Sequence, residues 1–295
     1  MRYTRTKAVI AGLMLAATAA CGNAGSDDEG ADVDVSKDAA SDFEDGTYMK
    51  ELADKGTINV GVKFDQPGLG FKGAADDVPA GFDIEMAKIL VASLGIDPSS
   101  DKVNWVETIS DNREPFLVGD KVDLVLASYS ITDERRQTVG QAGPYMVTGQ
   151  QVLVKNDSKV TGVADLKGKE VCSVTGSTSL ENVKTEGMKP VGFDTYSECV
   201  EKVLDGTVEA MSTDGTILLG YAAQNEGELK VVGDPFSEER IGIGYSKKHP
   251  EMCEWITDTV KKAQDDGDWA KAFETTLGKS GADTPEPPEM DPCQS

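Results

Sequence analysis

Short apolar runs alternate with segments of helical periodicity through the middle of the chain. The runs predicted to be strands cover residues 58–62, 103–106, 122–127, 151–154, 170–174, 208–211, 230–232 and 242–245. The segments predicted to be helices cover residues 84–94, 112–118, 252–265 and 269–277. Strands that alternate with helices in this way predict an α/β fold, with parallel sheets covered by helices on both faces.

The N-terminal segment has the pattern of an export signal. Three basic residues precede the apolar stretch Ala8–Leu15, and small residues continue to Cys21. The apolar stretch is too short to span a membrane, so residues 1–20 are predicted to be a signal peptide. The small residues resemble a bacterial lipobox, in which the cysteine is lipidated, although Thr18 stands where leucine is usual. Cleavage after Ala17-Thr-Ala19 is the alternative.

Composition separates both ends of the mature chain from its body. Residues 21–46 are mostly Gly, Ser, Ala and acidic residues and are predicted to be a disordered linker, and the Pro-rich tail 281–295 is also expected not to pack. The formal net charge is −23, and loss of the three cations of the signal makes it −26. Such an acidic protein is not expected to bind nucleic acid, and an anionic ligand would need local cations.

Cysteine usage predicts disulfides rather than a metal site. Apart from Cys21, the chain has an even number of cysteines, as exported proteins often do. Three pairings are possible, and the pairs that each fall within one region of the chain are favoured, which are Cys172–Cys199 and Cys253–Cys293. Zinc is the rival interpretation, but there is no Cys-x-x-Cys and only one histidine, so no metal is expected.

The loop after the strand 122–127 carries the clearest candidate chemistry. It reads Ser128-Tyr-Ser-Ile-Thr-Asp-Glu-Arg135, and its acidic residues indicate the start of a helix. The hydroxyls of Ser128 and Ser130, the free N–H groups of a helix start and the guanidinium of Arg135 together suit a carboxylate. The alternative is that the hydroxyls only cap the helix and that Arg135 is solvated.

One stretch resembles a known family. Residues 81–94, Gly-Phe-Asp-Ile-Glu-Met-Ala-Lys-Ile-Leu-Val-Ala-Ser-Leu, resemble the characteristic motif of the family-three extracellular solute-binding proteins, which serve amino-acid ABC importers. Further similarity extends from about residue 56 to 278. The segments 63–70, 172–178 and 213–218 resemble the glutamate-binding lipoproteins of Gram-positive actinobacteria. The pairing of Cys172 with Cys199 also fits that group.

The resemblance implies a two-lobed fold of the periplasmic-binding-protein type II, in which two strands cross the hinge and the lobes close on a ligand. Lobe one would comprise residues 47–146 and 241–280, and lobe two residues 147–240. The tail 281–295 would follow.

The resemblance also implies a set of contacts for a free amino acid. The α-carboxylate would meet Ser128, Ser130 and Arg135, together with backbone N–H groups of lobe two at Thr175, Gly176 and Ser177. A plain helix cap, with a capping box over residues 178–181, is the alternative for the lobe-two turn.

Two further groups of the ligand, its ammonium group and its side chain, have their own partners in that set. Asp214 would hold the α-ammonium group, with N-capping of the next helix as its alternative role. Ser110, Arg113 and Lys63 would hold a side-chain carboxylate, although either cation could instead form a surface salt bridge. Candidate apolar walls, not separable from core residues by sequence, are Phe64, Phe71, Tyr129 and Tyr145.

The function implied is an exported binding protein that captures glutamate or aspartate for an ABC permease with a cytoplasmic ATPase. It is expected to be a monomer without a cofactor, lipid-anchored at Cys21 on the outer face of the cell membrane. Glutamine or asparagine is the alternative ligand. A dehydratase-like enzyme on the same scaffold and a surface sensor are alternatives of other classes. The enzyme needs a positioned acid or base, whereas the site residues are mostly donors.

Overall fold

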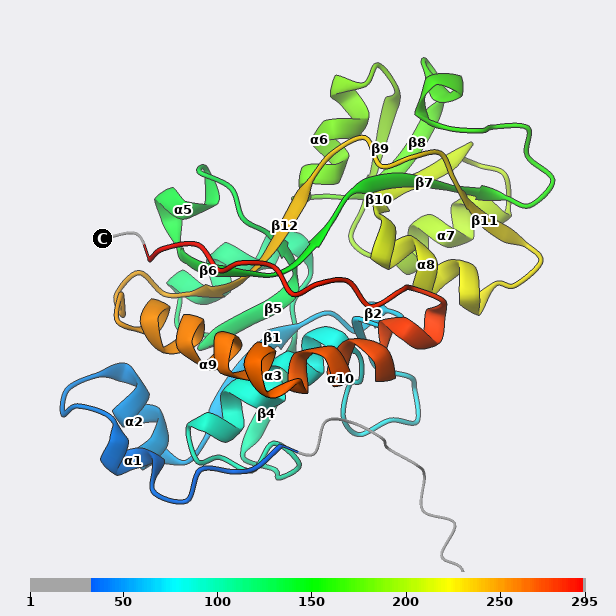
Figure 1. Ribbon diagram of the computed structural model, residues 1–295. Coiled ribbons are helices and arrows are strands. Elements are labelled where there is room, and N and C mark those ends of the chain that lie inside the picture. Colours follow the sequence, from blue (N-terminus) through cyan, green and yellow to red (C-terminus); the bar gives the residue numbers. More distant parts are fainter. Residues whose placement is uncertain (1–32, 294–295) are drawn as a thin grey trace, which may run out of the picture.

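The computed structural model describes residues 33–293, so the predicted signal peptide and Cys21 lie outside the described residues. Two five-stranded sheets form two lobes (Figure 1). No helix in the described part of the chain is long and apolar enough to cross a membrane.

The first lobe is built on a sheet of order β4-β1-β5-β12-β6. Its strands are β1 (Ile58–Val62), β4 (Val103–Glu107), β5 (Leu124–Ser130), β6 (Gly140–Thr148) and β12 (Glu239–Tyr245). Its helices are α2 (Tyr48–Lys55), α3 (Phe82–Ser93), α4 (Arg113–Val118), α5 (Arg135–Thr138), α9 (Met252–Asp266) and α10 (Asp268–Thr275). Short elements are β2 (Asp65–Gln66), β3 (Gly70–Phe71), and the 3-10 turns η1 (Ser110–Asn112) and η3 (Leu277–Ser280).

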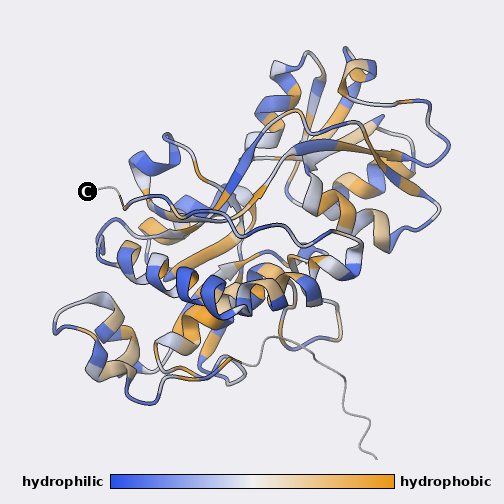
Figure 2. Cartoon of the chain, viewed as in Figure 1, coloured by the Kyte–Doolittle hydropathy of each residue, from blue (hydrophilic) through white to orange (hydrophobic). Residues whose placement is uncertain are grey.

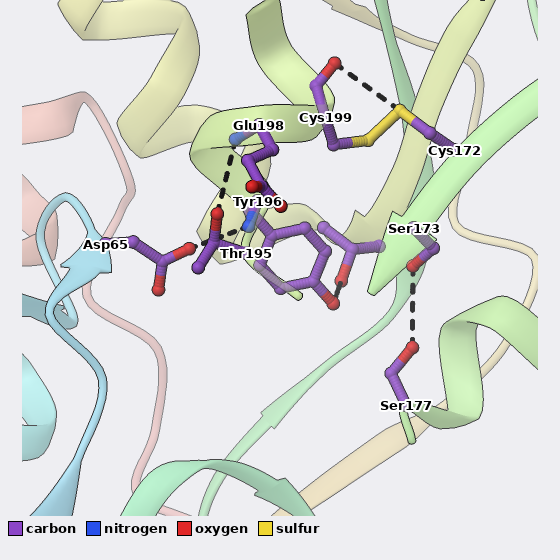
Figure 3. Close-up of a disulfide and its surroundings, with 9 residues drawn as sticks. Asp65, Cys172, Ser173, Ser177, Thr195, Tyr196, Glu198 and Cys199 are labelled. Atoms are coloured by element: carbon purple, nitrogen blue, oxygen red, sulfur yellow. Dashed lines mark hydrogen bonds between the residues drawn. A yellow bond between two sulfur atoms is a disulfide. The ribbon is translucent and has the colours of Figure 1, made fainter. Parts of the chain in front are cut away.

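The second lobe is built on a sheet of order β11-β7-β10-β8-β9. Its strands are β7 (Gln150–Lys155), β8 (Glu170–Val174), β9 (Lys189–Phe193), β10 (Ala210–Asp214) and β11 (Leu229–Val232). Its helices are α6 (Thr178–Thr185), α7 (Tyr196–Leu204) and α8 (Gly215–Gln224), with the 3-10 turn η2 (Val163–Leu166). The disulfide Cys172–Cys199 joins β8 to α7 in the interior of this lobe (Figure 3).

The expectation of parallel sheets is wrong in part, because both sheets are mixed. β1 pairs in parallel with β4 and β5, but β12 runs antiparallel to β5 and β6. In the second sheet β7 is antiparallel to β10 and β11. The chain passes from the first sheet to the second between β6 and β7 and returns between β11 and β12 (Figure 1). The outgoing and returning strands of the first lobe lie side by side and must therefore run in opposite directions.

The first lobe is held together by α3, which is buried on almost every side. Gly81 precedes this helix with φ 127°, and a Cβ there would lie 2.3 Å from the carbonyl oxygen of Leu69, so the position requires glycine. Phe82 packs edge-on against Trp269 and Phe273 of α10. Figure 2 shows the apolar strands inside and hydrophilic outer helix faces, as expected for amphipathic layers.

The predicted disordered linker is ordered from residue 33 onward. Residues 39–42 form the short helix α1 (Ala39–Asp42), and the N–H of Ser36 donates to the carbonyl oxygen of Ala92 at 3.1 Å. Val33 and Phe43 pack against the first lobe's core. Disorder is therefore wrong for residues 33–46, because the few apolar residues of this acidic segment find a preformed surface.

The start of α2 is also fixed to the first lobe. Thr47 caps the helix, and the Tyr48 ring stacks on His249 with ring centres 3.7 Å apart. The Tyr48 hydroxyl donates to Asp123 at 2.5 Å.

The Pro-rich tail also packs, contrary to expectation. Its prolines give it an extended path along the first lobe, where Met290 packs against the core. The disulfide Cys253–Cys293 joins its end to α9, and the N–H of Asp291 donates to the carbonyl oxygen of Gly143 at 2.6 Å. Both disulfides are thus those favoured from the spacing of the cysteines.

Candidate functional site

A narrow cavity lies between the lobes, where β5 and β10 end. Seven of the predicted site residues line it, which are Ser110, Arg113, Ser128, Ser130, Arg135, Ser177 and Asp214. The lining residues that sequence reasoning missed are Gln66, Thr178, Ser179, Tyr196 and Ile217.

Arg113 begins α4 and is almost fully buried, with 2% of its surface exposed. Its Nη1 donates to the carbonyl oxygens of Ala127 and Ser128 at 3.2 and 3.3 Å, at the end of β5. Among residues 33–293 no carboxylate lies within ion-pair distance of Arg113. Burial, and secondarily the charge of Arg135, lower the pKa of Arg113 to about 10.

Arg135 lies beside Arg113 on the same aromatic ring. The guanidinium carbons of Arg113 and Arg135 lie 4.4 and 4.9 Å from the centre of the Tyr129 ring. Arg135 donates from Nη1 to the carbonyl oxygen of Ser130 at 2.7 Å, and its Nε lies 3.4 Å from Glu114. The ring face of Tyr129 offsets part of the repulsion between the two cations.

The end of β5, which lies between Arg113 and Arg135 in the sequence, has a strained backbone conformation. Ser128 has φ 45°, which is uncommon for a residue with a side chain. Its N–H donates to Asp83 at 2.9 Å, and the Tyr145 hydroxyl donates to the other oxygen of Asp83 at 2.6 Å. Asp83, at the start of α3, thus positions the end of β5.

Lys63 follows β1 and is 2% exposed. Its Nζ donates to the Ser110 hydroxyl at 3.0 Å, so these two predicted site residues lie together. No carboxylate of the described chain lies within ion-pair distance of its ammonium group. Burial, and then the charge of Arg113, lower the pKa of Lys63 to about 7.

Asp214 provides the opposite charge from the second lobe. It ends β10 and is 3% exposed, and its side chain does not cap α8. Within residues 33–293 its carboxylate has no hydrogen-bond partner. Burial, and then the charge of Glu239, raise the pKa of Asp214 to about 8. The capping role considered from the sequence is therefore absent here.

The second-lobe turn differs from the expectation. The N–H of Thr175 donates to the carbonyl oxygen of Phe193 in β9 at 2.8 Å. The N–H of Ser177 donates to the carbonyl oxygen of Val174 at 3.3 Å. These N–H groups are therefore not available to a carboxylate. At Gly176 it is the carbonyl oxygen that meets the first lobe, accepting from Arg113 at 3.1 Å and Arg135 at 3.0 Å.

The predicted capping box is also displaced by one residue. Ser177, rather than Thr178, caps α6 by accepting from the N–H of Leu180. The Thr178 hydroxyl instead lies 3.3 Å from that of Ser130 and donates to Glu239 at 3.1 Å. Thr178 thus links the two lobes at the cavity.

Of the four candidate aromatic walls, only Tyr129 contacts the site arginines. Tyr145 supports Asp83, Phe71 lines a different surface pocket, and Phe64 packs against the core. Tyr196 is an additional aromatic residue of the cavity (Figure 3). Its N–H donates to Asp65 across the lobes at 2.7 Å. Nothing in the sequence near Tyr196 indicates this, because the contact depends on how the lobes meet.

The cavity therefore separates two kinds of charge. Arg113 and Arg135 line it from the first lobe, with Lys63 behind them bonded to the lining residue Ser110, and the buried, unpaired carboxylate of Asp214 lines it from the second. Burial of unpaired charges is costly, so such a set indicates a ligand that carries complementary charges. Within the described residues no group of His, Cys, Asp and Glu side chains is arranged to hold a metal ion.

The fold and this interlobe cavity define a class of protein. Residues 58–279 match the family model of the bacterial extracellular solute-binding proteins, family 3, and the chain belongs to this family.

Individual relatives have narrower descriptions. The chain is 38% identical over 252 residues to the glutamate-binding protein GluB of Corynebacterium efficiens, which covers 82% of this chain and 85% of that protein. It is 31% identical over 268 residues to the ABC transporter glutamine-binding protein GlnH of Bacillus subtilis, with 90% and 93% covered. Among solved structures, an ancestral arginine-binding protein bound to glutamine aligns with a TM-score of 0.69 at 35% identity, covering 76% of this chain and 98% of that one.

Proposed function

We propose that this protein captures an acidic amino acid, glutamate or aspartate, and delivers it to an ABC permease with a cytoplasmic ATPase. The observation that carries the proposal is the unpaired carboxylate of Asp214 in one cavity with Arg113 and Arg135, with Lys63 bonded to Ser110 of the same cavity. A zwitterion needs one cation and one anion. The surplus of cations on the first lobe therefore favours a ligand with a second carboxylate.

Each part of the ligand then has a partner. Arg135, with Ser128 and Ser130, binds the α-carboxylate, and Asp214 binds the α-ammonium group. Arg113 and Lys63, with Ser110 between them in the hydrogen-bond chain, bind the side-chain carboxylate. Both arginines now donate to the uncharged carbonyl of Gly176, which a carboxylate can replace with stronger charge-assisted bonds.

Ligand binding favours the closed arrangement because the partners lie on both lobes. The contacts Arg113–Gly176, Ser130–Thr178 and Asp65–Tyr196 already join the lobes. A ligand that bridges Asp214 and the arginines adds to these contacts only when the lobes are together. Its differential affinity thus selects the closed state, which the permease would recognise.

The location of the protein belongs to the same proposal. The family is extracellular, and the N-terminal sequence has an export signal that ends at Cys21. We infer a monomer anchored by a lipid at Cys21 to the outer face of the cell membrane. We further propose that one lobe comprises residues 47–146 with 241–280, and the other residues 147–240.

Glutamine or asparagine is the second candidate ligand. An arginine also donates to an amide oxygen, and a relative in Bacillus subtilis is described as a glutamine-binding protein. We do not propose an enzyme, because the cavity offers mainly hydrogen-bond donors and the described relatives are binding proteins.

Calorimetric titration of ligand-free protein with glutamate, aspartate, glutamine and asparagine tests the proposal. An acidic ligand is expected to bind more than about tenfold more tightly than its amide, from the value of a hydrogen bond to a charged group. Tighter binding of an amide would overturn the acidic specificity. Absence of binding by all four would overturn the amino-acid site itself.

A further inference from the structure

The Pro-rich tail lies beyond the family domain, which ends at residue 279, yet it contacts the hinge strands. In Figure 1 it follows α10, runs back past β12 and ends near β6. The tail is attached at its far end by the disulfide Cys253–Cys293.

Asp291 is the tail residue that contacts the elements next to the cavity. Its carboxylate oxygens lie 2.5 Å from Nη2 of Arg240 and 3.3 Å from Nη2 of Arg136. Its N–H donates to the carbonyl oxygen of Gly143 at 2.6 Å. One residue thus joins α5, β12 and β6, and the last two are the strands next to the lobe crossings.

Each arginine held by Asp291 is adjacent in sequence to a residue that lines the cavity or bonds to a lining residue. Arg136 follows Arg135 in α5. Arg240 follows Glu239, which accepts from the Thr178 hydroxyl at 3.1 Å. A displacement of either arginine therefore moves a group at the cavity by way of one peptide unit.

The helix α5 depends on such outside contacts because it has only four residues. A helix of one turn has no stability of its own. Among residues 33–293, Asp291 is the one acid within ion-pair distance of Arg136, whose buried Nε has no hydrogen-bond partner. Without Asp291, the guanidinium of Arg136 would keep only one hydrogen bond, a long one of 3.5 Å to the carbonyl oxygen of Gln141, although Lys247 would still donate to the carbonyl oxygen of Arg136 at 2.7 Å.

We propose that the tail is a strap across the hinge and that Asp291 is a positioning residue for the amino-acid site. It holds the helix that carries Arg135 and the strand that carries Glu239. The inference rests on the proposed function for its ligand. Asp291 acts through its neighbours and does not itself contact the cavity.

Two physical effects of Asp291 have opposite signs, so they can be separated. Its negative charge lies near the site, and its long-range field alone disfavours an anionic ligand. If Asp291 acts only through its long-range field, loss of its charge would strengthen glutamate binding. If it positions the site, the same loss would weaken glutamate binding. The direction of the change therefore decides between them.

The test compares Asp291→Asn with Glu289→Gln, which removes the same charge from an exposed position of the same tail. Glutamate affinity is measured by calorimetry, and hydrogen exchange is measured at the amides of Arg136, Gln137 and Val139 in ligand-free protein. Asp291→Asn is expected to weaken glutamate binding about tenfold and to accelerate exchange at all three amides. Glu289→Gln is expected to change neither.

Unchanged or tighter glutamate binding by Asp291→Asn would overturn the proposal, as would unchanged exchange at α5. If Asp291→Asn folds poorly, Asp291→Glu decides instead, because it keeps the charge and is expected to retain most of the exchange protection. Exposure of α5 in that variant would count against the proposal. If the unmodified protein binds no glutamate, the proposed function fails, and exchange at α5 alone decides whether Asp291 holds the helix.

Discussion

Arg113 and Arg135 donate to the same acceptor, the carbonyl oxygen of Gly176, at 3.1 and 3.0 Å. Two cations from different helices of the first lobe thus converge on one atom of the second. Their mutual repulsion in a buried site is reduced by the Tyr129 ring and by backbone carbonyls but not by a shared carboxylate. A ligand anion placed there would relieve that repulsion, so closure and anion binding favour each other.

The two arginines are expected to differ in what they recognise. Arg135→Ala should weaken all four amino acids by roughly 10–100-fold or more, because each loses its α-carboxylate partner. Arg113→Ala should weaken glutamate about tenfold more than glutamine. Calorimetric titration measures both. Equal losses for glutamate and glutamine with Arg113→Ala would contradict its side-chain role, and intact binding with Arg135→Ala would contradict the whole assignment.

Asp214→Asn should separate ligand binding from stability. Removing one charge of a buried pair costs about 2–5 kcal/mol, so glutamate affinity should fall by at least about 30-fold. The ligand-free protein should nevertheless be as stable as the unmodified one or more so, because the unpaired buried carboxylate is itself unfavourable. Titration and thermal unfolding without ligand test the two halves. A clear loss of ligand-free stability would indicate a structural role for Asp214.

The same residue predicts a pH dependence. Burial raises the folded-state pKa of Asp214 to about 8, whereas its unfolded value is about 3.9. Between these values the folded state binds the extra proton, so the contribution of Asp214 to stability falls as the pH rises from about 4 to 8. Asp214→Asn should remove this slope. Ligand-free unfolding curves at several pH values measure it, and an unchanged slope would show that Asp214 titrates normally.

Lys63 should make the preference for glutamate over glutamine depend on pH. Its pKa is lowered to about 7, so in the ligand-free protein its charge is present below that pH and lost above it. The ratio of glutamate to glutamine affinity should therefore fall between pH 6 and 9. The ionisation of Asp214 affects the affinity for both ligands alike, because both carry the same ammonium group. Its effect therefore cancels in the affinity ratio. Lys63→Met should lower the affinity ratio at pH 6 and remove its dependence on pH. If the ratio still depended on pH in this variant, another group would be responsible.

Gly220→Ala should interfere with closure. Gly220 lies in α8, and a Cβ there would be 2.1 Å from the carbonyl oxygen of Pro67 on the first lobe. Alanine suits a helix interior by about 1 kcal/mol better than glycine, so the ligand-free lobe should not be destabilised. Glutamate affinity should fall, and small-angle scattering should show a more open form with ligand. Normal affinity would mean that closure does not need this contact.

Local patterns in the sequence predict much of the fold. The motif at residues 81–94 and the apolar strands predict α3, β1, β5 and β8 because burial of those elements is almost complete. β6 was not predicted, since Gly140, Gly143 and Pro144 are typical of turns. That strand exists because β12, about a hundred residues later, pairs with it.

The site shows the same division between local and long-range information. Ser128 and Asp214 lie at the ends of β5 and β10 and Arg135 follows β5, so their chemistry is visible locally. The misassigned N–H of Thr175 is used by β9, a strand without a strong apolar pattern. Asp83 and Tyr196 act through contacts with residues far away in the chain, which no local pattern encodes.

Both ends of the described chain are fixed to the first lobe. Near one end Tyr48 stacks on His249, and near the other the N–H of Asp291 donates to the carbonyl oxygen of Gly143. The second lobe is thus an insertion without a free end, bounded on both sides by the hinge. The closure proposed above would therefore move neither end of the described chain relative to the first lobe. A lipid anchor at Cys21 would therefore hold the first lobe beside the membrane while the second lobe moves. Closure of the lobes would not pull on the anchor.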